Sequence, residues 1–266
     1  MGKDNYLRLF EEFIKTIGLT EKEKETVVRE LYSEESISRM PNANYLLDEK
    51  SKERFCDFVG YLYSKIGEYG VDYIRDALEY AFSYKDDNNN LLDQFIRFVA
   101  VTNFDEIKVD IENKDGNISV QATLGGLELS HNRNVTYVLE ENRLMCEWFH
   151  NRRGLKRTKI GSLMMTEFFK YALNTYPDVV VCSDNVRRDN VDAQAFYRKI
   201  GFSIIDLDKE SNSLFVEIGP DKMRECINNN EGVYPVILFE GRRYDYTTYK
   251  NSKRETPIIE NGGETK

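Results

Sequence analysis

The sequence predicts an α+β protein in which an N-terminal helical region precedes a mixed β-sheet flanked by helices. Up to about residue 102, apolar residues recur every three or four positions, which is the spacing of one helical face. From Phe104 onward, apolar and polar residues alternate, as they do in half-buried strands. Farther on, apolar strands alternate with helical segments, a layout typical of a mixed sheet. We therefore expect a helical region over residues 1–102, a sheet domain over 103–219, and a C-terminal extension of helix, hairpin and flexible tail over 220–266.

The helical region should contain five helices. The first ends near Ile17, before Gly18, and Thr20 with Glu23 forms a capping box that opens the second. The apolar faces of the other three cover residues 55–66, 74–82 and 91–101. Because no residue of this region forms a catalytic constellation, we interpret it as a helical bundle; the alternative is a cap that binds a partner or selects a substrate.

The sheet domain should open with an antiparallel meander. Its strands are expected at residues 107–111, 118–122, 127–129, 135–139 and 144–149. A helix (161–173), a strand (178–182), a second helix (191–200) and two further strands (202–207 and 213–218) follow. Beyond Gly219 we expect a short helix over 221–228 and a strand pair, 234–239 and 244–249, around a turn at Glu240 and Gly241. Residues 251–266 carry no core pattern.

Composition narrows the class of ligand. The 266 residues include 46 acidic and 37 basic side chains, a net charge of −9, which counts against a broad nucleic-acid surface and mildly favours a cationic substrate. No apolar run is long enough to cross a membrane, and the N-terminus has no secretory pattern, so a cytoplasmic protein is expected. The four cysteines form no C-x-x-C pair and read as reduced core thiols. The spacing between the two histidines and these cysteines matches no familiar zinc-binding pattern, so we expect no metal site.

A basic loop joins an expected strand to an expected helix over residues 150–162. It supplies five positive charges within eight residues: Arg152, Arg153, Lys156, Arg157 and Lys159. The first N–H groups of a helix are unpaired and lie at the positive end of its dipole, so a phosphate binds there readily. Gly161 has no Cβ and allows an anion to approach the backbone. The segment predicts a phosphorylated ligand; the alternative is a solvated basic loop that only opens a helix.

A second informative segment spans residues 190–202. Asn190 is a natural N-cap, and Ala193 and Tyr197 share a helical face four residues apart. Gly201 suits the left-handed position that ends the helix, and Phe202 re-enters the sheet. Taken alone, this segment is a capped amphipathic helix with a core tyrosine.

Together the two segments resemble the GNAT superfamily of acyl-CoA N-acyltransferases. The family pattern N-x-x-A-x-x-x-Y-x-x-x-G-F is complete at residues 190–202. In the family's pyrophosphate loop, Q/R-x-x-G-x-G/A, Lys156 takes the first position and Gly161 the last, whereas Lys159 stands where the first glycine is usual. The resemblance covers residues 104–219, most specifically 144–203, and it implies a GNAT-like mixed sheet.

The resemblance also implies a binding site for acetyl-CoA. Its pyrophosphate would lie on the loop backbone, and its pantetheine would pair like an extra strand with the end of the strand that precedes the loop. The residues implied in binding are Phe149, His150, Lys156, Arg157, Thr158, Lys159, Ile160, Gly161, Ser162 and Asn190.

The implied reaction is direct attack of a deprotonated amine on the thioester. Tyr197 would protonate the departing thiolate, and the ordinary pKa values of a thiol, about 8.5, and a phenol, about 10, are nearly matched. Glu147 or His150 would take the amine proton; they lie on opposite strand faces, and Glu147 is favoured because carboxylates serve on this strand in some relatives.

The sequence therefore predicts an N-acetyltransferase that uses acetyl-CoA and no metal, acting on a primary amine of a small molecule, peptide or protein. The alternative is a non-catalytic module that binds acyl-CoA or a partner. A third hypothesis, toxin-like acyl transfer to tRNA or to another protein, is weakened for tRNA by the net charge of −9. The oligomeric state stays open.

Overall fold

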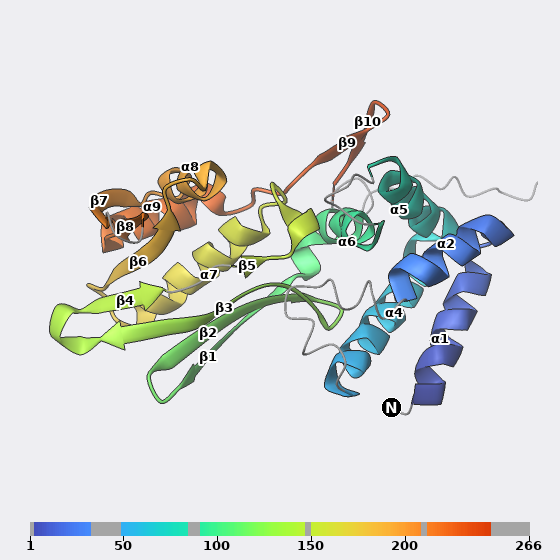
Figure 1. Ribbon diagram of the computed structural model, residues 1–266, viewed down its shortest axis with the longest axis horizontal. Helices are drawn as coiled ribbons and strands as arrows, with labels where there is room; N and C mark the ends of the chain where they lie inside the picture. The colour runs from blue at the N-terminus through green and yellow to red at the C-terminus, as the bar shows by residue number, and fades with distance from the viewer. Residues whose placement is uncertain (1–2, 33–48, 85–90, 147–149, 209–211, 246–266) are drawn as a thin grey trace, which may run out of the picture.

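The protein has an α+β fold, as the sequence predicts, with helices at the N-terminus and a mixed sheet after them (Figure 1). A computed structural model describes residues 3–32, 49–84, 91–146, 150–208 and 212–245. Within these ranges no helix combines the length and the apolar character needed to cross a bilayer. The residues expected to form the flexible tail, and most of the strand expected at 244–249, lie outside them.

All five helices expected in the N-terminal region are found. They are α1 (Lys3–Thr16), α2 (Glu21–Tyr32), α4 (Glu49–Tyr69), α5 (Val71–Ser83) and α6 (Leu91–Thr102). The capping box before α2 is confirmed: the Thr20 N–H donates to Glu23 Oε2 at 2.8 Å, and the Glu23 N–H donates to Thr20 Oγ1 at 3.3 Å. Gly70, at a φ of 86°, separates α4 from α5.

Helix α6 is buried on nearly every residue, because it lies between the other helices and the sheet domain (Figure 1). A second contact joins the two regions at the turn between strands β2 (Asn117–Leu124) and β3 (Leu127–Val138). Gly125 adopts a φ of 54° there, and a Cβ on it would lie 2.6 Å from the Tyr61 side chain of α4. The helical region therefore packs closely against the sheet domain.

The described sheet has eight strands in the order β1-β2-β3-β4-β6-β8-β7, with β5 paired to β3. The strands not yet introduced are β1 (Lys108–Lys114), β4 (Arg143–Cys146), β5 (His150–Asn151), β6 (Val180–Arg187), β7 (Ser203–Asp208) and β8 (Ser213–Ile218). The expected meander is confirmed, since β1 to β4 pair antiparallel in sequence order. Strands β4 and β6 are the parallel pair.

The strands expected separately at 127–129 and 135–139 are one strand, β3, of 12 residues. A polar run, residues 130–134, lies between them. It continues as a strand because its backbone is paired on both sides: His131 lies opposite Gln121 of β2 and opposite His150 of β5. Backbone hydrogen bonds, rather than side-chain polarity, decide the structure of this segment.

Three helices flank the sheet. They are α7 (Ile160–Thr175), which packs across β1, β2 and β3, α8 (Val191–Lys199) and α9 (Pro220–Asn230), which packs against α7. The final hairpin of β9 (Ile237–Phe239) and β10 (Arg242–Tyr244) has the expected turn between its strands. It packs on the helical region, where the Phe239 ring centroid is 5.7 Å from that of Tyr80. The C-terminal extension thus contacts both regions.

Candidate active site

The sheet parts between β4 and β6. These strands pair in parallel only from Arg143 to Met145 and from Val180 to Cys182. Beyond that point the chain of β4 resumes as β5, which in the described residues pairs with β3, whereas β6 continues along β8 with a bulge between Ser183 and Val186. The strand edges that face this parting can hydrogen-bond an extended ligand.

Tyr197 reaches the parting from α8. Its hydroxyl hydrogen-bonds Ser183 of β6 and lies near the Cys146 thiol of β4, and its ring stands edge-on to Phe202 with centroids 5.0 Å apart. Asn190 caps this helix by accepting from the Ala193 N–H at 3.1 Å, and Gly201 ends it at a φ of 104°. The side-chain oxygen of Asn190 is therefore engaged in capping.

Burial raises the pKa of Tyr197 well above its ordinary value; the nearby Cys146 adds to this, while the Ser183 hydrogen bond opposes it. The near match between phenol and thiol pKa values expected from the sequence is therefore wrong. The phenol is a weaker acid than a free tyrosine, and it keeps its proton throughout the neutral range. It can donate a strong hydrogen bond to a developing thiolate without having to transfer the proton completely.

The two cysteines at the parting are buried core residues, as expected. Burial raises the pKa of the Cys146 thiol, and it raises the pKa of Cys182 to about 11. Because the thiolate is the reactive form, neither thiol is suited to act as a nucleophile at neutral pH.

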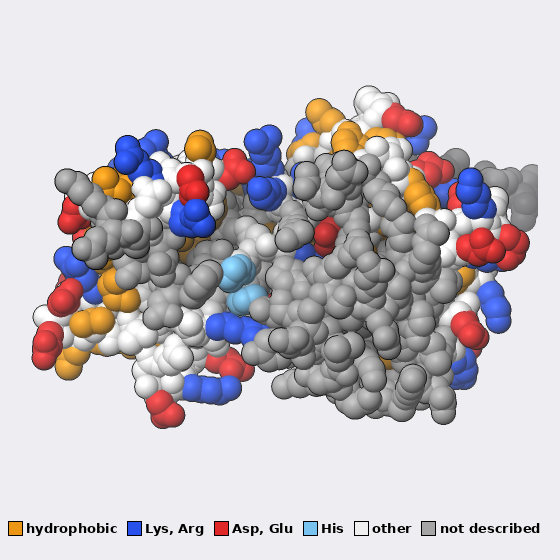
Figure 2. Space-filling model, in the orientation of Figure 1, with side chains coloured by type: hydrophobic (Ala, Val, Ile, Leu, Met, Phe, Trp, Pro, Cys, Tyr) orange, Lys and Arg blue, Asp and Glu red, His pale blue; other side chains and the backbone are white. Residues whose placement is uncertain are grey.

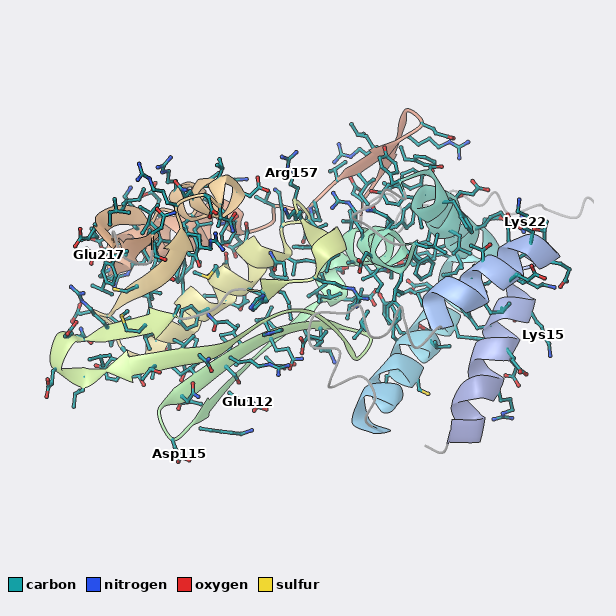
Figure 3. All side chains as sticks on the ribbon, in the orientation of Figure 1. Lys15, Lys22, Glu112, Asp115, Arg157 and Glu217 are labelled. Atoms are coloured by element: carbon teal, nitrogen blue, oxygen red, sulfur yellow. The ribbon has the colours of Figure 1, made fainter. Side chains whose placement is uncertain are left out.

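At the end of the basic loop, just before α7, the backbone has a conformation that can bind anions. Arg157 and Lys159 both adopt a φ of 63°, and α7 begins directly after Lys159. The left-handed Lys159 followed by the right-handed first turn of α7 gives the backbone alternation whose N–H groups form a concave, anion-binding nest. Lys159 occupies the position where the family pattern has a glycine, and its left-handed backbone gives the physical reason for that preference. Figure 3 shows the Arg157 side chain pointing outward from the loop.

Other loop side chains predicted to bind the cofactor point into the protein. Thr158 is buried and donates from Oγ1 to the Leu155 carbonyl at 2.6 Å, and Ile160 belongs to the core. A Cβ on Gly161 would lie 3.1 Å from Asn151 Nδ2 and 3.4 Å from the Phe196 ring, so these side chains would have to shift slightly to admit one. The Thr158 N–H also donates to the Leu155 carbonyl, at 3.4 Å, so the N–H groups of Ile160 and Gly161 at the start of α7 are the ones that can serve a ligand. Ser162 is half-buried beside them.

The basic cluster is smaller than the sequence indicates. Arg152 is buried and donates from Nε to Asp93 Oδ1 at 3.0 Å, so its charge is engaged inside the protein. The exposed Lys156 contacts Asp192 of α8 at 3.3 Å. Burial, and the neighbouring Lys199, lower the pKa of Lys159. Among the described side chains of the cluster, Lys156, Arg157 and Lys159 remain near the surface to attract a phosphate, and the Arg153 side chain lies outside the described ones.

His150 lies beside a residue that the sequence reasoning missed. Its ring centroid is 5.4 Å from that of His131, and His131 Nδ1 is 2.7 Å from Glu128 Oε1 (Figure 2). Burial and the nearby His131 lower the pKa of His150, which favours the neutral, proton-accepting form. No local sequence pattern indicates this pair; the register of β3 with β5 in the folded chain places the only two histidines of the sequence opposite each other.

Tyr197 and His150 lie at different positions along the gap between β4 and β6. Tyr197 lies near Cys146, the last residue of β4, whereas His150 belongs to β5, which leads directly into the basic loop. His150 therefore belongs to the end nearer the basic loop. The other two residues expected here, Glu147 and Phe149, lie outside the described residues. Within the described ranges no group of three or more His, Cys, Asp or Glu side chains is arranged to hold a metal ion.

The structure of this chain is similar to several solved structures of acetyltransferases. No family model and no curated protein matches the chain. The ribosomal-protein-S18-alanine N-acetyltransferase of Escherichia coli is 13% identical over 40% of this chain and 71% of its own, with a TM-score of 0.35. Naa50 of Arabidopsis thaliana, solved with a bisubstrate CoA analogue, is 17% identical over 37% of this chain and 70% of its own, with a TM-score of 0.32.

A third structure spans more of the chain. The PaiA N-acetyltransferase of Thermoplasma acidophilum, solved with coenzyme A, is 15% identical over 77% of this chain and 94% of its own, with a TM-score of 0.35. At such TM-scores these likenesses carry no functional inference by themselves. The order and pairing of this chain's own strands, with the parting between β4 and β6, give residues 108–218 a GNAT-like fold.

Proposed function

We propose that the protein is an N-acetyltransferase that moves an acetyl group from acetyl-CoA to a primary amine of a small molecule, peptide or protein. The observation that carries this proposal is the position of Tyr197, a partly buried side chain whose hydroxyl lies where β4 and β6 part, beside Ser183 and Cys146. A module that only binds acyl-CoA has no need of a proton-bearing phenol at that point.

Two parts of the site bind acetyl-CoA: the basic loop binds its pyrophosphate, and the gap between β4 and β6 binds its pantetheine arm. The pyrophosphate lies on the N–H groups around Arg157 and Lys159 and at the start of α7, with the exposed charges of Lys156 and Arg157 beside it. The pantetheine arm runs into the parting as an added strand, which directs the thioester toward the level of Tyr197.

The chemistry is direct acyl transfer. The amine nitrogen attacks the thioester carbonyl, the carbon–sulfur bond breaks, and the sulfur leaves as a thiolate that accepts a hydrogen bond or a proton from the Tyr197 hydroxyl. Because burial raises the pKa of Tyr197, the phenol stays protonated and ready to donate throughout the neutral range.

The proton of the attacking amine goes to Glu147. This residue directly follows Cys146 in the sequence, and Cys146 lies near Tyr197, whereas His150 belongs to β5 beside the basic loop. The net charge of −9 favours a cationic acceptor at the enzyme surface.

Calorimetry with CoA and with acetyl-CoA, followed by thiol release with a panel of amines, tests the proposal. We expect both nucleotides to bind and at least one amine class to release thiol. Binding without release for every amine would support the non-catalytic alternative, and the absence of binding would remove the acyl-CoA assignment altogether.

A further inference from the structure

The basic loop is held by a helix that lies outside the part of the chain resembling the GNAT family. Helix α6 of the N-terminal region carries Asp93 and Arg97 four residues apart, and therefore on one face. Asp93 accepts from Arg152 Nε at 3.0 Å, with only 12% and 5% of the two side chains exposed. A buried pair with this geometry fixes the start of the loop.

Arg97 contacts the next turn of the loop through its backbone. Its Nη1 donates to the Gly154 carbonyl at 3.0 Å and also to the Lys156 carbonyl, and its Nε donates to the Tyr80 hydroxyl at 3.1 Å. One guanidinium thus joins α5, α6 and two loop carbonyls. The planar fork of arginine suits such a multiple contact, and a lysine ammonium does not reproduce it.

Helix α6 and the loop approach each other as closely as two backbones can. A Cβ on Gly154 would lie 2.6 Å from the Asp93 carbonyl oxygen and 2.7 Å from its Cβ. Only glycine permits this approach, so the loop lies directly on α6 rather than over a layer of side chains.

The contact with Lys156 determines which way the loop's N–H groups point. Peptide bonds are planar, and all of those in the described residues are trans, so the carbonyl and the following N–H point in opposite directions. With the Lys156 carbonyl turned toward Arg97, the Arg157 N–H is directed away from α6. Lys159, three residues beyond Lys156, adopts the left-handed conformation that precedes α7 and gathers N–H groups for an anion.

We propose that Arg97 and Asp93 are positioning residues of the CoA site, and that the N-terminal helical region sets the affinity for CoA by holding the loop in its anion-binding conformation. This inference rests on the proposed acetyl-CoA function. It makes the helical region part of the cofactor site, although none of its residues need touch the cofactor.

The test measures CoA affinity in the full-length Arg97→Met protein by calorimetry, with hydrogen exchange of the amides of residues 152–161 as a second readout. We expect CoA to bind about tenfold more weakly, since two hydrogen bonds of ordinary strength orient the loop. The amides of the loop should exchange faster. In steady-state kinetics the KM for acetyl-CoA should rise, with kcat nearly unchanged.

Arg75→Met is the matched control, because Arg75 of α5 donates to the Ile17 carbonyl at 3.4 Å inside the helical region and does not contact the loop. It should bind CoA as the unaltered protein does. Equal weakening in both variants would indicate general loosening and would overturn the inference.

If Arg97→Met fails to fold, the CoA affinity of Arg97→Lys provides the test. We expect an intermediate loss of affinity, and unchanged affinity in this variant would overturn the inference while leaving the acetyltransferase proposal intact. If the unaltered protein does not bind CoA, both proposals fall together.

Discussion

The helical region and the mixed sheet use their polar groups in opposite ways. In the helical region, Lys65 is buried between Glu68, at 2.8 Å, and Glu106. The Tyr73 hydroxyl likewise lies 2.8 Å from Thr102 Oγ1 inside the core. In the sheet domain, by contrast, Tyr197 lies where β4 and β6 part, and the left-handed Lys159 directly precedes α7. The pairs of the helical region hold its core together, whereas Tyr197 and the start of α7 lie where a ligand can reach them.

This difference predicts which property a substitution in each region will change. Changes at the parting should alter binding or rate and leave stability nearly intact. Changes within the helical region should lower the free energy of unfolding, and changes at its junction with the loop should affect both stability and CoA binding.

Tyr197→Phe should reduce the rate of acetyl transfer by about 10²–10⁴-fold, because it removes the proton donor and keeps the ring packed on Phe202. The affinity for CoA should change little, since the phosphates are held by the loop. Steady-state kinetics and calorimetry on one preparation measure both. Full activity in this variant would place leaving-group protonation on water or on another residue.

Arg152→Met should lower the free energy of unfolding by about 3–5 kcal/mol, because Asp93 would lose its buried partner. Urea unfolding measures the loss, and the double variant Asp93→Leu with Arg152→Met should recover part of it. The exposed pair of Lys170 and Glu167, 2.7 Å apart, is the control; Lys170→Met should change stability by less than about 1 kcal/mol. A small effect of Arg152→Met would contradict the view that this junction is scaffold.

Gly161→Asp should weaken CoA binding by about 100-fold or more, because it places a negative charge at the start of α7 where the pyrophosphate is proposed to lie. The fold should be retained, as judged by circular dichroism. Gly161→Ala separates charge from bulk, since its methyl group meets Asn151 and Phe196 equally closely. Unaltered CoA affinity in the aspartate variant would remove the loop from the binding site.

Alkaline pH should destabilise the protein through its buried tyrosines. Burial raises the pKa of Tyr73 and of Tyr197, so above pH about 10 the unfolded chain releases phenol protons that the folded protein retains. The free energy of unfolding should therefore be insensitive to these groups below pH about 10 and fall above it, by about 1.4 kcal/mol per pH unit for each group. Urea unfolding from pH 7 to 11 measures the slope, and Tyr73→Phe should reduce it by one group.

Lys159→Gly should raise the free energy of unfolding by up to about 1 kcal/mol, because a glycine adopts the φ of 63° without the strain that a Cβ imposes there. Thermal unfolding measures the gain. Calorimetry on the same variant shows whether the lysine charge or the loop backbone contributes more to CoA affinity. A loss of stability would show that the partly buried lysine stem stabilises the loop by more than the backbone strain destabilises it.

Much of the local structure follows from short sequence patterns. The apolar periodicity of the five N-terminal helices, the capping box of Thr20 and Glu23, and the Asn190 cap all form as expected, because each depends on residues within one turn of each other. The order of strands and helices after Phe104 also follows from local periodicity. The motif of residues 190–202 correctly placed a tyrosine on a capped helix.

Tertiary packing decided what local patterns could not. Strand β3 runs through a polar segment because neighbouring strands on both sides satisfy its backbone. Arg152, one of five basic residues in the loop by sequence, is withdrawn from the surface by Asp93, 59 positions away. The raised pKa of Tyr197 arises from burial, which no sequence window reports. Each of these outcomes depends on partners distant in sequence. The sequence by itself therefore determined the elements and the candidate motif, whereas only the folded chain decided which charges stay at the surface, and that the helical region supports the loop.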